Sequence, residues 1–346
     1  MSSVLTEIEE TSRSLVAEGR GILAADESTG TMNKRLAAVL DREPDEEARR
    51  SFRELLFTTE DAASQISGAI LYDETLRQNA SDGTPFAELL KAQGILPGIK
   101  VDTGAKPLAG SPGELVTEGL DGLRGRLAEY RQMGARFAKW RAVITIGDGF
   151  PTPYCIAVNA HALARYAALC QEAGIVPIVE PEVLMDGEHT IERSEEVTEM
   201  ALRQLFAELA AQNVALTAML LKPNMILSGY GCSRQAGVDQ VAARTVDCFR
   251  RVVPAAVAGI TFLSGGQSDE AAYAHLNAIN RIGGQPWELS FSYGRALQAT
   301  PLAIWRGLPS EVAAAQASYL QRARWAGAAR CGEYSADLGL EPAPTS

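Results

Sequence analysis

One lysine of this chain occupies a position that suits covalent chemistry with a carbonyl compound. Residues 218–225 read Ala-Met-Leu-Leu-Lys-Pro-Asn-Met, an apolar run of strand character that ends at Lys222. Pro223 cannot donate to a sheet ladder and restricts the residue before it to extended geometry, so we expect Lys222 to end a buried strand. Apolar surroundings lower the pKa of an amine and leave part of it neutral and nucleophilic. Such a lysine can form a Schiff base, although a solitary strand-end lysine more commonly extends to solvent.

Lysine is scarce in this sequence, which strengthens that interpretation. Of the 32 basic residues only six are lysines, and arginine supplies the rest. A guanidinium is not deprotonated in proteins and cannot form an imine, so a lysine retained here is expected to serve a function of its amine. Three of the six, Lys100, Lys139 and Lys222, lie on predicted strands or at their ends.

Composition disfavours several classes of function. The chain has 346 residues, 46% of them hydrophobic, and a formal net charge of −11. This acidic balance argues against nucleic acid or an anionic membrane as the main partner, and we expect neither a secretory signal nor a membrane span. Five scattered cysteines without a C-x-x-C pair indicate reduced thiols, not a disulfide framework or a zinc site. We therefore expect a cytoplasmic protein.

Apolar runs alternate with helical stretches along the whole chain. Strands are expected over residues 21–25, 66–72, 98–101, 136–144, 175–182, 214–222, 259–266 and 287–293, and helices over 4–19, 45–57, 117–133, 159–173, 192–212, 238–251, 271–280 and 310–331. Nearly continuous apolar strands indicate parallel pairing with both faces covered. We predict an α/β fold, a (β/α)8 TIM barrel, with residues 1–346 as one domain and a flexible C-terminal tail over about 333–346. An open doubly wound sheet is the alternative, but no glycine-rich dinucleotide fingerprint follows an early strand.

Polar residues gather at the ends of seven predicted strands. In a barrel of this type the active site lies at the C-terminal ends of the strands. The residues expected there are Asp26, Lys100, Lys139, Arg141, Glu180, Glu182, Lys222, Ser264, Gly265, Gly266, Ser292, Gly294 and Arg295. A solvated strand end would explain any one of them, but the convergence of the whole set predicts a catalytic mouth.

The residue types at this mouth fit a small anionic substrate. Five of them are lysines or arginines in an otherwise acidic protein, and their field attracts an anion. The Ser-Gly-Gly turn at 264–266 and the Tyr-Gly-Arg sequence at 293–295 follow the last two strands, where barrels commonly bind phosphate. Arg35 and Lys100 on the opposite side of the rim indicate a second phosphate, and hence a bisphosphate.

A chemical role can be written for each central side chain. Lys139 beside Lys222 is expected to depress the pKa of the latter by repulsion between like charges. Glu180 can transfer protons while a carbinolamine loses water, and Asp26 can take or return a hydroxyl proton as a C–C bond breaks or forms. Glu182, which ends the same strand as Glu180, is grouped with these catalytic residues. The protonated imine then acts as the electron sink, so no metal ion or other cofactor is expected.

Seven segments together resemble class I fructose-1,6-bisphosphate aldolases. They are GILAADESTG, GIKVD, FAKWR, IVPIVEPE, LLKPNM, GITFLSGGQS and FSYGRALQA, and the resemblance extends from the first helix to about Tyr334. It implies a (β/α)8 barrel, usually a homotetramer, that reversibly cleaves fructose 1,6-bisphosphate into dihydroxyacetone phosphate and glyceraldehyde 3-phosphate without a metal.

The resemblance also implies roles for individual residues. Lys222 matches the Schiff-base lysine and Glu180 the acid–base residue. Asp26 matches the group that handles the hydroxyl proton, and Lys139 the lysine that supports the imine. The positions that hold the substrate and its phosphates correspond to Arg35, Lys100, Arg141, Ser264, Gly265, Gly266, Ser292, Gly294 and Arg295.

Two departures from the family pattern carry consequences. Well-studied animal members have a further lysine shortly after AKWR, where this chain has Thr145, so one rim charge is missing. Those members also end in a tyrosine on a mobile tail that assists proton exchange, whereas this chain ends LGLEPAPTS. We expect the late proton transfer to be slower here or to be served by another group.

Three other functions remain open at this level. A metal-dependent aldolase would need a histidine-rich zinc site, but the three histidines, His161, His189 and His275, are scattered. A Schiff-base barrel for another keto acid or sugar phosphate would differ in the spacing of its cations. A scaffold protein that had lost activity would be expected to lack Lys222, Glu180 or Asp26.

Overall fold

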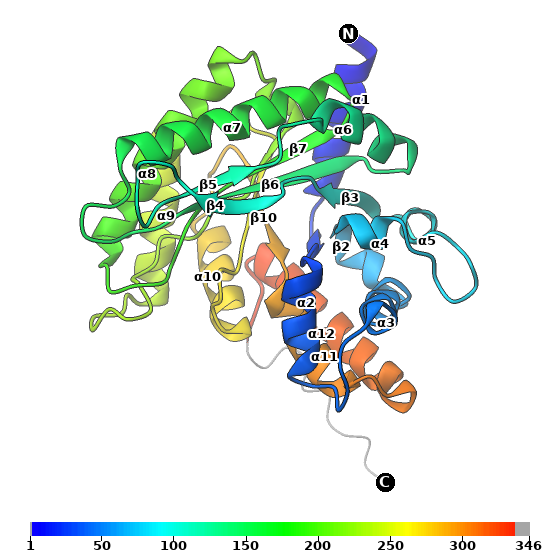
Figure 1. Ribbon diagram of the computed structural model, residues 1–346. Coiled ribbons are helices and arrows are strands. Elements are labelled where there is room, and N and C mark those ends of the chain that lie inside the picture. Colours follow the sequence, from blue (N-terminus) through cyan, green and yellow to red (C-terminus); the bar gives the residue numbers. More distant parts are fainter. Residues whose placement is uncertain (1, 336–346) are drawn as a thin grey trace.

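The computed structural model, which describes residues 2–335, shows a closed barrel of parallel strands surrounded by helices (Figure 1). Around the barrel the strand order is β1-β10-β9-β8-β7-β6-β3-β2. The predicted (β/α)8 architecture is therefore confirmed. Residues 336–346, which make up most of the predicted tail, lie outside the described residues.

The barrel strands follow the apolar runs of the sequence, because each is covered on both faces. Most of their residues are buried, as expected for parallel strands between a packed interior and a layer of helices. Their bounds are β1 (Gly21–Ala25), β2 (Ile66–Leu71), β3 (Leu96–Lys100), β6 (Phe137–Ile144), β7 (Val176–Val183), β8 (Leu220–Leu221), β9 (Gly259–Phe262) and β10 (Glu288–Tyr293).

Five of the helices begin at a short polar side chain that accepts from a free backbone N–H. Ser28, Asp45, Thr152, Thr190 and Ser268 each cap the helix that follows. The helices are α1 (Ser2–Leu15), α2 (Thr29–Ala37), α3 (Glu46–Phe57), α4 (Asp73–Leu76), α5 (Phe86–Ala92), α6 (Leu123–Gln132), α7 (Pro153–Glu172), α8 (Ile191–Ala211), α9 (Val238–Val252), α10 (Asp269–Ile282), α11 (Arg295–Trp305) and α12 (Val312–Arg330). No helix among residues 2–335 is long and apolar enough to cross a membrane.

The expected helix over 117–133 is wrong in its first turn and a half. Residues there form β5 (Leu115–Glu118), which pairs antiparallel with β4 (Gly104–Pro107) outside the barrel. The hydroxyl of Thr117 donates to the carbonyl of Arg141 at 2.7 Å, which ties this hairpin to β6. Gly119 and Gly122 have positive φ of 131° and 66°, so the chain turns before α6 begins.

Two of the expected strands are markedly shorter in the structure, and the helices expected over 4–19 and 159–173 instead span Ser2–Leu15 and Pro153–Glu172. The strand expected over 214–222 is only Leu220–Leu221, because a 3-10 turn occupies Leu216–Ala218. Pairing nevertheless continues past its end, since the N–H of Lys222 donates to the carbonyl of Val179 at 2.8 Å. The strand expected over 259–266 ends at Phe262. Helix α11 was not predicted, because Pro301 lies inside it and proline normally breaks a helix.

Candidate active site

A cavity of about 990 Å³ opens at the carboxyl ends of the barrel strands. The predicted site residues that line it are Asp26, Arg35, Lys100, Lys139, Arg141, Glu180, Glu182, Lys222, Ser264, Gly265, Ser292, Gly294 and Arg295. Gly266 alone of the predicted set is not on its wall. A Cβ added to Gly266 would nevertheless lie 2.8 Å from Nη2 of Arg295, so this glycine borders a residue that is. Parallel strands bring residues that are far apart in the sequence to one rim.

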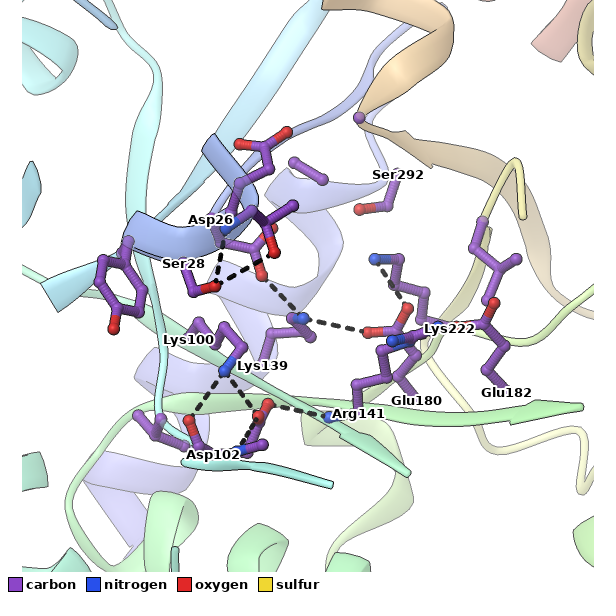
Figure 2. Close-up of a pocket in the computed structure, with 18 of the residues that line it drawn as sticks. Asp26, Ser28, Lys100, Asp102, Lys139, Arg141, Glu180, Glu182, Lys222 and Ser292 are labelled. Atoms are coloured by element: carbon purple, nitrogen blue, oxygen red, sulfur yellow. Dashed lines mark hydrogen bonds and ion pairs between the residues drawn. The ribbon is translucent and has the colours of Figure 1, made fainter. Parts of the chain in front are cut away.

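Four charged side chains form a chain across the cavity floor (Figure 2). Nζ of Lys222 lies 3.0 Å from Oε1 of Glu180. Oε2 of Glu180 lies 3.4 Å from Nζ of Lys139, which in turn is 2.7 Å from Oδ2 of Asp26. The two lysines and Glu180 have side chains no more than 5% exposed, so water screens these charges weakly.

The protonation states of these four side chains follow from the alternation of positive and negative groups. Burial would raise the pKa of Asp26, but the positive charges of Lys139 and Lys222 outweigh it and lower that pKa to about 2. Burial would likewise raise the pKa of Glu180, but the positive charges of Lys222 and Lys139 outweigh that effect and lower it. Burial would lower the pKa of Lys139, yet Asp26 and Glu180 raise it. At neutral pH both acids are carboxylates and Lys139 is an ammonium ion.

This geometry corrects one expectation about Lys139. The two lysines were expected to face each other as like charges, but the carboxylate of Glu180 lies between their ammonium groups. Glu180 therefore contacts the nitrogen of Lys222 directly and is placed to exchange protons with it. Lys139 is matched instead to two carboxylates, Asp26 and Glu180.

Asp102 is a buried member of the site that sequence reasoning missed. Its Oδ1 pairs with Nζ of Lys100 at 2.6 Å, and its Oδ2 accepts from the backbone N–H of Arg141 at 3.2 Å. The guanidinium of Arg141 pairs with Glu182. Asp102 thus connects Lys100 at the end of β3 with Arg141 on β6 (Figure 2). The signal was present in GIKVD, where an acid stands two residues after a strand-end lysine, the spacing that puts both on one side of extended chain.

The segment after β9 has the backbone of an anion-binding turn. Gly265 and Gly266 have φ of 58° and 95°, a left-handed conformation that glycine adopts without strain. Consecutive N–H groups in such a turn can face one ligand. Arg295, the first residue of α11, lies beside them at the positive end of that helix. The hydroxyl of Tyr230 donates to the carbonyl of Gly265 at 3.2 Å and braces the turn.

Ser292 adds an unused polar atom to the cavity. It is 1% exposed, and its Oγ has no hydrogen-bond partner among the residues that the structure describes. Figure 2 shows this hydroxyl directed into the space between Asp26 and Lys222. Buried polar groups are normally paired, so an unpaired one on a cavity wall is suited to a ligand. Over residues 2–335, no group of three or more His, Cys, Asp or Glu side chains is arranged to hold a metal ion.

Comparison with known proteins agrees with this geometry. Residues 7–343 match the model of the family described as fructose-bisphosphate aldolase class-I. The chain belongs to the class I fructose-bisphosphate aldolase family. It is 56% identical over 331 residues to a probable fructose-bisphosphate aldolase class 1 of Xanthomonas campestris pv. campestris, covering 95% of this chain and 99% of that protein. It is 50% identical over 330 residues to fructose-bisphosphate aldolase C-B of Danio rerio, covering 95% and 91%.

A solved structure of a fructose-bisphosphate aldolase supports the same membership. The fructose-bisphosphate aldolase of Plasmodium falciparum superimposes with a TM-score of 0.95 at 46% identity, covering 97% of each chain. The family resemblance drawn from the seven segments is thereby confirmed. The departure at Thr145 lies directly after β6, which ends at Ile144, so the rim lacks a cation at that point.

Proposed function

We propose that this chain reversibly cleaves fructose 1,6-bisphosphate into dihydroxyacetone phosphate and glyceraldehyde 3-phosphate through an imine on Lys222. Membership of the class I aldolase family supports the reaction. The observation that carries the assignment of the nucleophile is the contact between Nζ of Lys222 and Oε1 of Glu180 at 3.0 Å, inside a cavity rimmed by cations. An amine that forms an imine needs a proton-transfer group within hydrogen-bond reach.

The proposed first half of the reaction builds the imine. Glu180 takes a proton from the ammonium group of Lys222, and the resulting neutral amine attacks the ketone carbon of the open-chain sugar. The carbonyl oxygen takes that proton from Glu180 and becomes the hydroxyl of a carbinolamine. Glu180, protonated after it takes a proton from the nitrogen, returns that proton to the hydroxyl, which leaves as water. The product is an iminium ion on Lys222. Because Glu180 contacts both Lys222 and Lys139, the carboxylate is held in place for both proton transfers.

The proposed second half breaks the carbon–carbon bond. Asp26 takes the proton of the C4 hydroxyl, the C3–C4 bond breaks, and its electron pair moves into the iminium to form an enamine. The aldehyde leaves, C3 of the enamine takes the proton that Asp26 had accepted, and water then hydrolyses the iminium, which releases dihydroxyacetone phosphate and regenerates Lys222. Lys139, 2.7 Å from Asp26, keeps that acid ionised before it acts as the base.

Two groups of residues are proposed to hold the two phosphates. On one side of the cavity the turn of Ser264, Gly265 and Gly266 lies with Ser292, Gly294 and Arg295. Arg35 and Lys100 also line the cavity, and we propose that they hold the second phosphate. Glu182 and Arg141 form an ion pair on the wall next to Glu180, and we propose that the pair orients the sugar between the phosphates.

Substitution of Gly266 by alanine is expected to raise KM for fructose 1,6-bisphosphate about tenfold, with a smaller effect on kcat. The positive φ costs an alanine about 1–2 kcal/mol, and its methyl group would displace Arg295. Steady-state kinetics checks this. Gly125→Ala in α6, where an added Cβ meets nothing within 4 Å, is the matched control. An unchanged KM in Gly266→Ala would remove this turn from the phosphate site.

Further properties are inferred from the family alone. We infer a homotetramer, a cytoplasmic location, and catalysis that needs no metal ion. Residues 1–346 are proposed to form one domain, since the strands of the barrel come from the whole length of the described chain. Sedimentation analysis and an assay in excess chelator test the first and third of these.

Borohydride trapping tests the proposed function as a whole. The protein is incubated with fructose 1,6-bisphosphate and excess chelator, reduced, digested and mapped by mass spectrometry. A reduced substrate adduct on Lys222 would support the imine, the nucleophile and independence from metal together. An adduct on another lysine would overturn the site but keep the reaction class. If no adduct forms and chelator abolishes cleavage, the class I mechanism is wrong for this chain.

A further inference from the structure

Behind the end of β1, one carboxylate serves two arginines. Glu27 directly follows Asp26, and its side chain is 7% exposed. Its Oε1 accepts from Nη1 of Arg35 at 2.6 Å, and its Oε2 accepts from Nη2 of Arg53 at 2.7 Å. Arg35 lies on α2 and Arg53 on α3, two helices that pack against each other (Figure 1). The proposed reaction gives neither Glu27 nor Arg53 a role.

The two arginines differ in how firmly they are held. Arg53 is 2% exposed, and it also donates from Nε to the carbonyl of Ala25 at 2.9 Å. The side chain of Arg35 is 28% exposed on the cavity wall, and within residues 2–335 its one hydrogen bond goes to Glu27. Arg53 is therefore fixed at both ends of its guanidinium, whereas Arg35 is free to leave once another anion competes for it.

Glu27 remains paired with a cation, Arg53, if Arg35 leaves. A carboxylate buried without a partner is costly, so an exchange of partners requires that Glu27 retain one. Arg53 supplies the equal and opposite charge at Oε2. At Oε1 the amide of Gln298 also donates, at 3.0 Å, while the same nitrogen donates to the carbonyl of Ala24 at 2.7 Å. The Glu27–Arg53 pair is thus neutral by itself, and Arg35 is the surplus cation beside the cavity.

We propose that Glu27 is a positioning residue that holds Arg35 against the cavity wall until a substrate phosphate takes its place. Arg53 and Gln298 make the exchange inexpensive, because they keep Glu27 paired after Arg35 has turned to the phosphate. The proposal rests on the proposed function in one respect, since it takes Arg35 to be a phosphate ligand. Gln298 lies one turn after Arg295 on α11, so the same carboxylate also contacts the helix that carries the other phosphate-binding arginine.

A cycle of substitutions at Arg53 and Arg35 tests this exchange. Arg53→Met leaves Glu27 with Arg35 as its only cation. Glu27 should then hold Arg35 more tightly, and Arg35 should bind the substrate phosphate less readily. We expect KM for fructose 1,6-bisphosphate to rise about tenfold while kcat stays within about twofold. In the Arg35→Met background, Arg53→Met should have no further effect on KM. Combining Arg53→Met with Glu27→Gln removes both buried charges and should return KM to within about threefold of the unsubstituted protein.

The outcomes separate this proposal from the proposed function. If Arg35→Met leaves KM unchanged, Arg35 does not bind phosphate, and both the assignment and the exchange are wrong. If Arg35→Met raises KM but Arg53→Met acts equally in both backgrounds, only the exchange is wrong. Should Arg53→Met not fold, Gln298→Met removes a milder donor to Glu27 and should raise KM about threefold, again only when Arg35 is present. A fall in kcat in place of a rise in KM would show that these residues act on Asp26 and would overturn the proposal.

Discussion

Replacing Lys222 is expected to lower kcat for cleavage of fructose 1,6-bisphosphate by about 10⁵-fold or more, the scale seen when a covalent nucleophile is removed. Arginine retains the positive charge but cannot form an imine, and methionine retains much of the shape without an amine. Both variants should lose activity to a similar extent, because the imine is the electron sink of the proposed reaction. Neither should give an adduct at position 222 when it is reduced with borohydride in the presence of substrate.

The packing of Lys222 against Glu180 determines which controls the experiment needs. Its side chain is 5% exposed and contacts Glu180, so a substitution could disturb the proton-transfer group as well as remove the amine. Circular dichroism and thermal midpoints establish that each variant is folded. Lys106→Arg, at an exposed position of the outer hairpin, is the matched control and should retain full activity and full labelling of Lys222. Substantial cleavage by the methionine variant would contradict the imine mechanism.

Glu180→Gln is expected to lower kcat by about 10³-fold, within the range of about 10²–10⁴ that general acid–base catalysis contributes. The amide has nearly the same shape as the carboxylate but can neither take a proton from Lys222 nor deliver one to the leaving hydroxyl. Imine formation should become slow, whereas substrate affinity, which depends on the cations at the rim, should change little. Single-turnover kinetics with borohydride quenching separates imine formation from the later steps.

The pH dependence gives a second readout of Glu180. Lys222 and Lys139 lower the pKa of this acid in spite of burial, so the carboxylate form persists to lower pH than for an ordinary glutamate. Activity that needs the carboxylate is lost as pH falls through that lowered pKa. In Glu180→Gln this acid limb should disappear from the kcat profile. Glu188→Gln, at an exposed position beyond β7, should leave both rate and profile unchanged. A variant that kept the acid limb would show that another group controls it.

Local sequence patterns were sufficient to predict most of the fold. Short apolar runs between helical stretches located β1 and β7 to within a residue or two at each end, because these strands are buried on both faces and their composition records it. The position of the site at the strand ends then followed from the barrel itself.

What was missed depends on contacts between distant segments. The hairpin of β4 and β5 is fixed by bonds to β6 and α7, which nothing within residues 104–118 announces. Strand β8 is short because it pairs with β7 and β9 only at Leu220 and Leu221. Glu27 and Arg53 are 26 residues apart in sequence and meet only once the helices have packed. The placement of Glu180 between Lys139 and Lys222 likewise depends on how the strands pack, so the sequence alone did not predict it.

The scarcity of lysine has a consequence for the chemical durability of the protein. Of the six lysines, Lys100, Lys139 and Lys222 line the cavity, and Lys34, Lys91 and Lys106 are exposed. An enzyme that handles sugar phosphates and releases an aldehyde meets reactive carbonyl compounds at every turnover. Any exposed amine can be glycated by them, but an arginine at neutral pH does not form an imine. By carrying its surface charge on arginine, the chain offers few side-chain amines to its own substrate and product, and adventitious glycation of the outer surface is correspondingly limited.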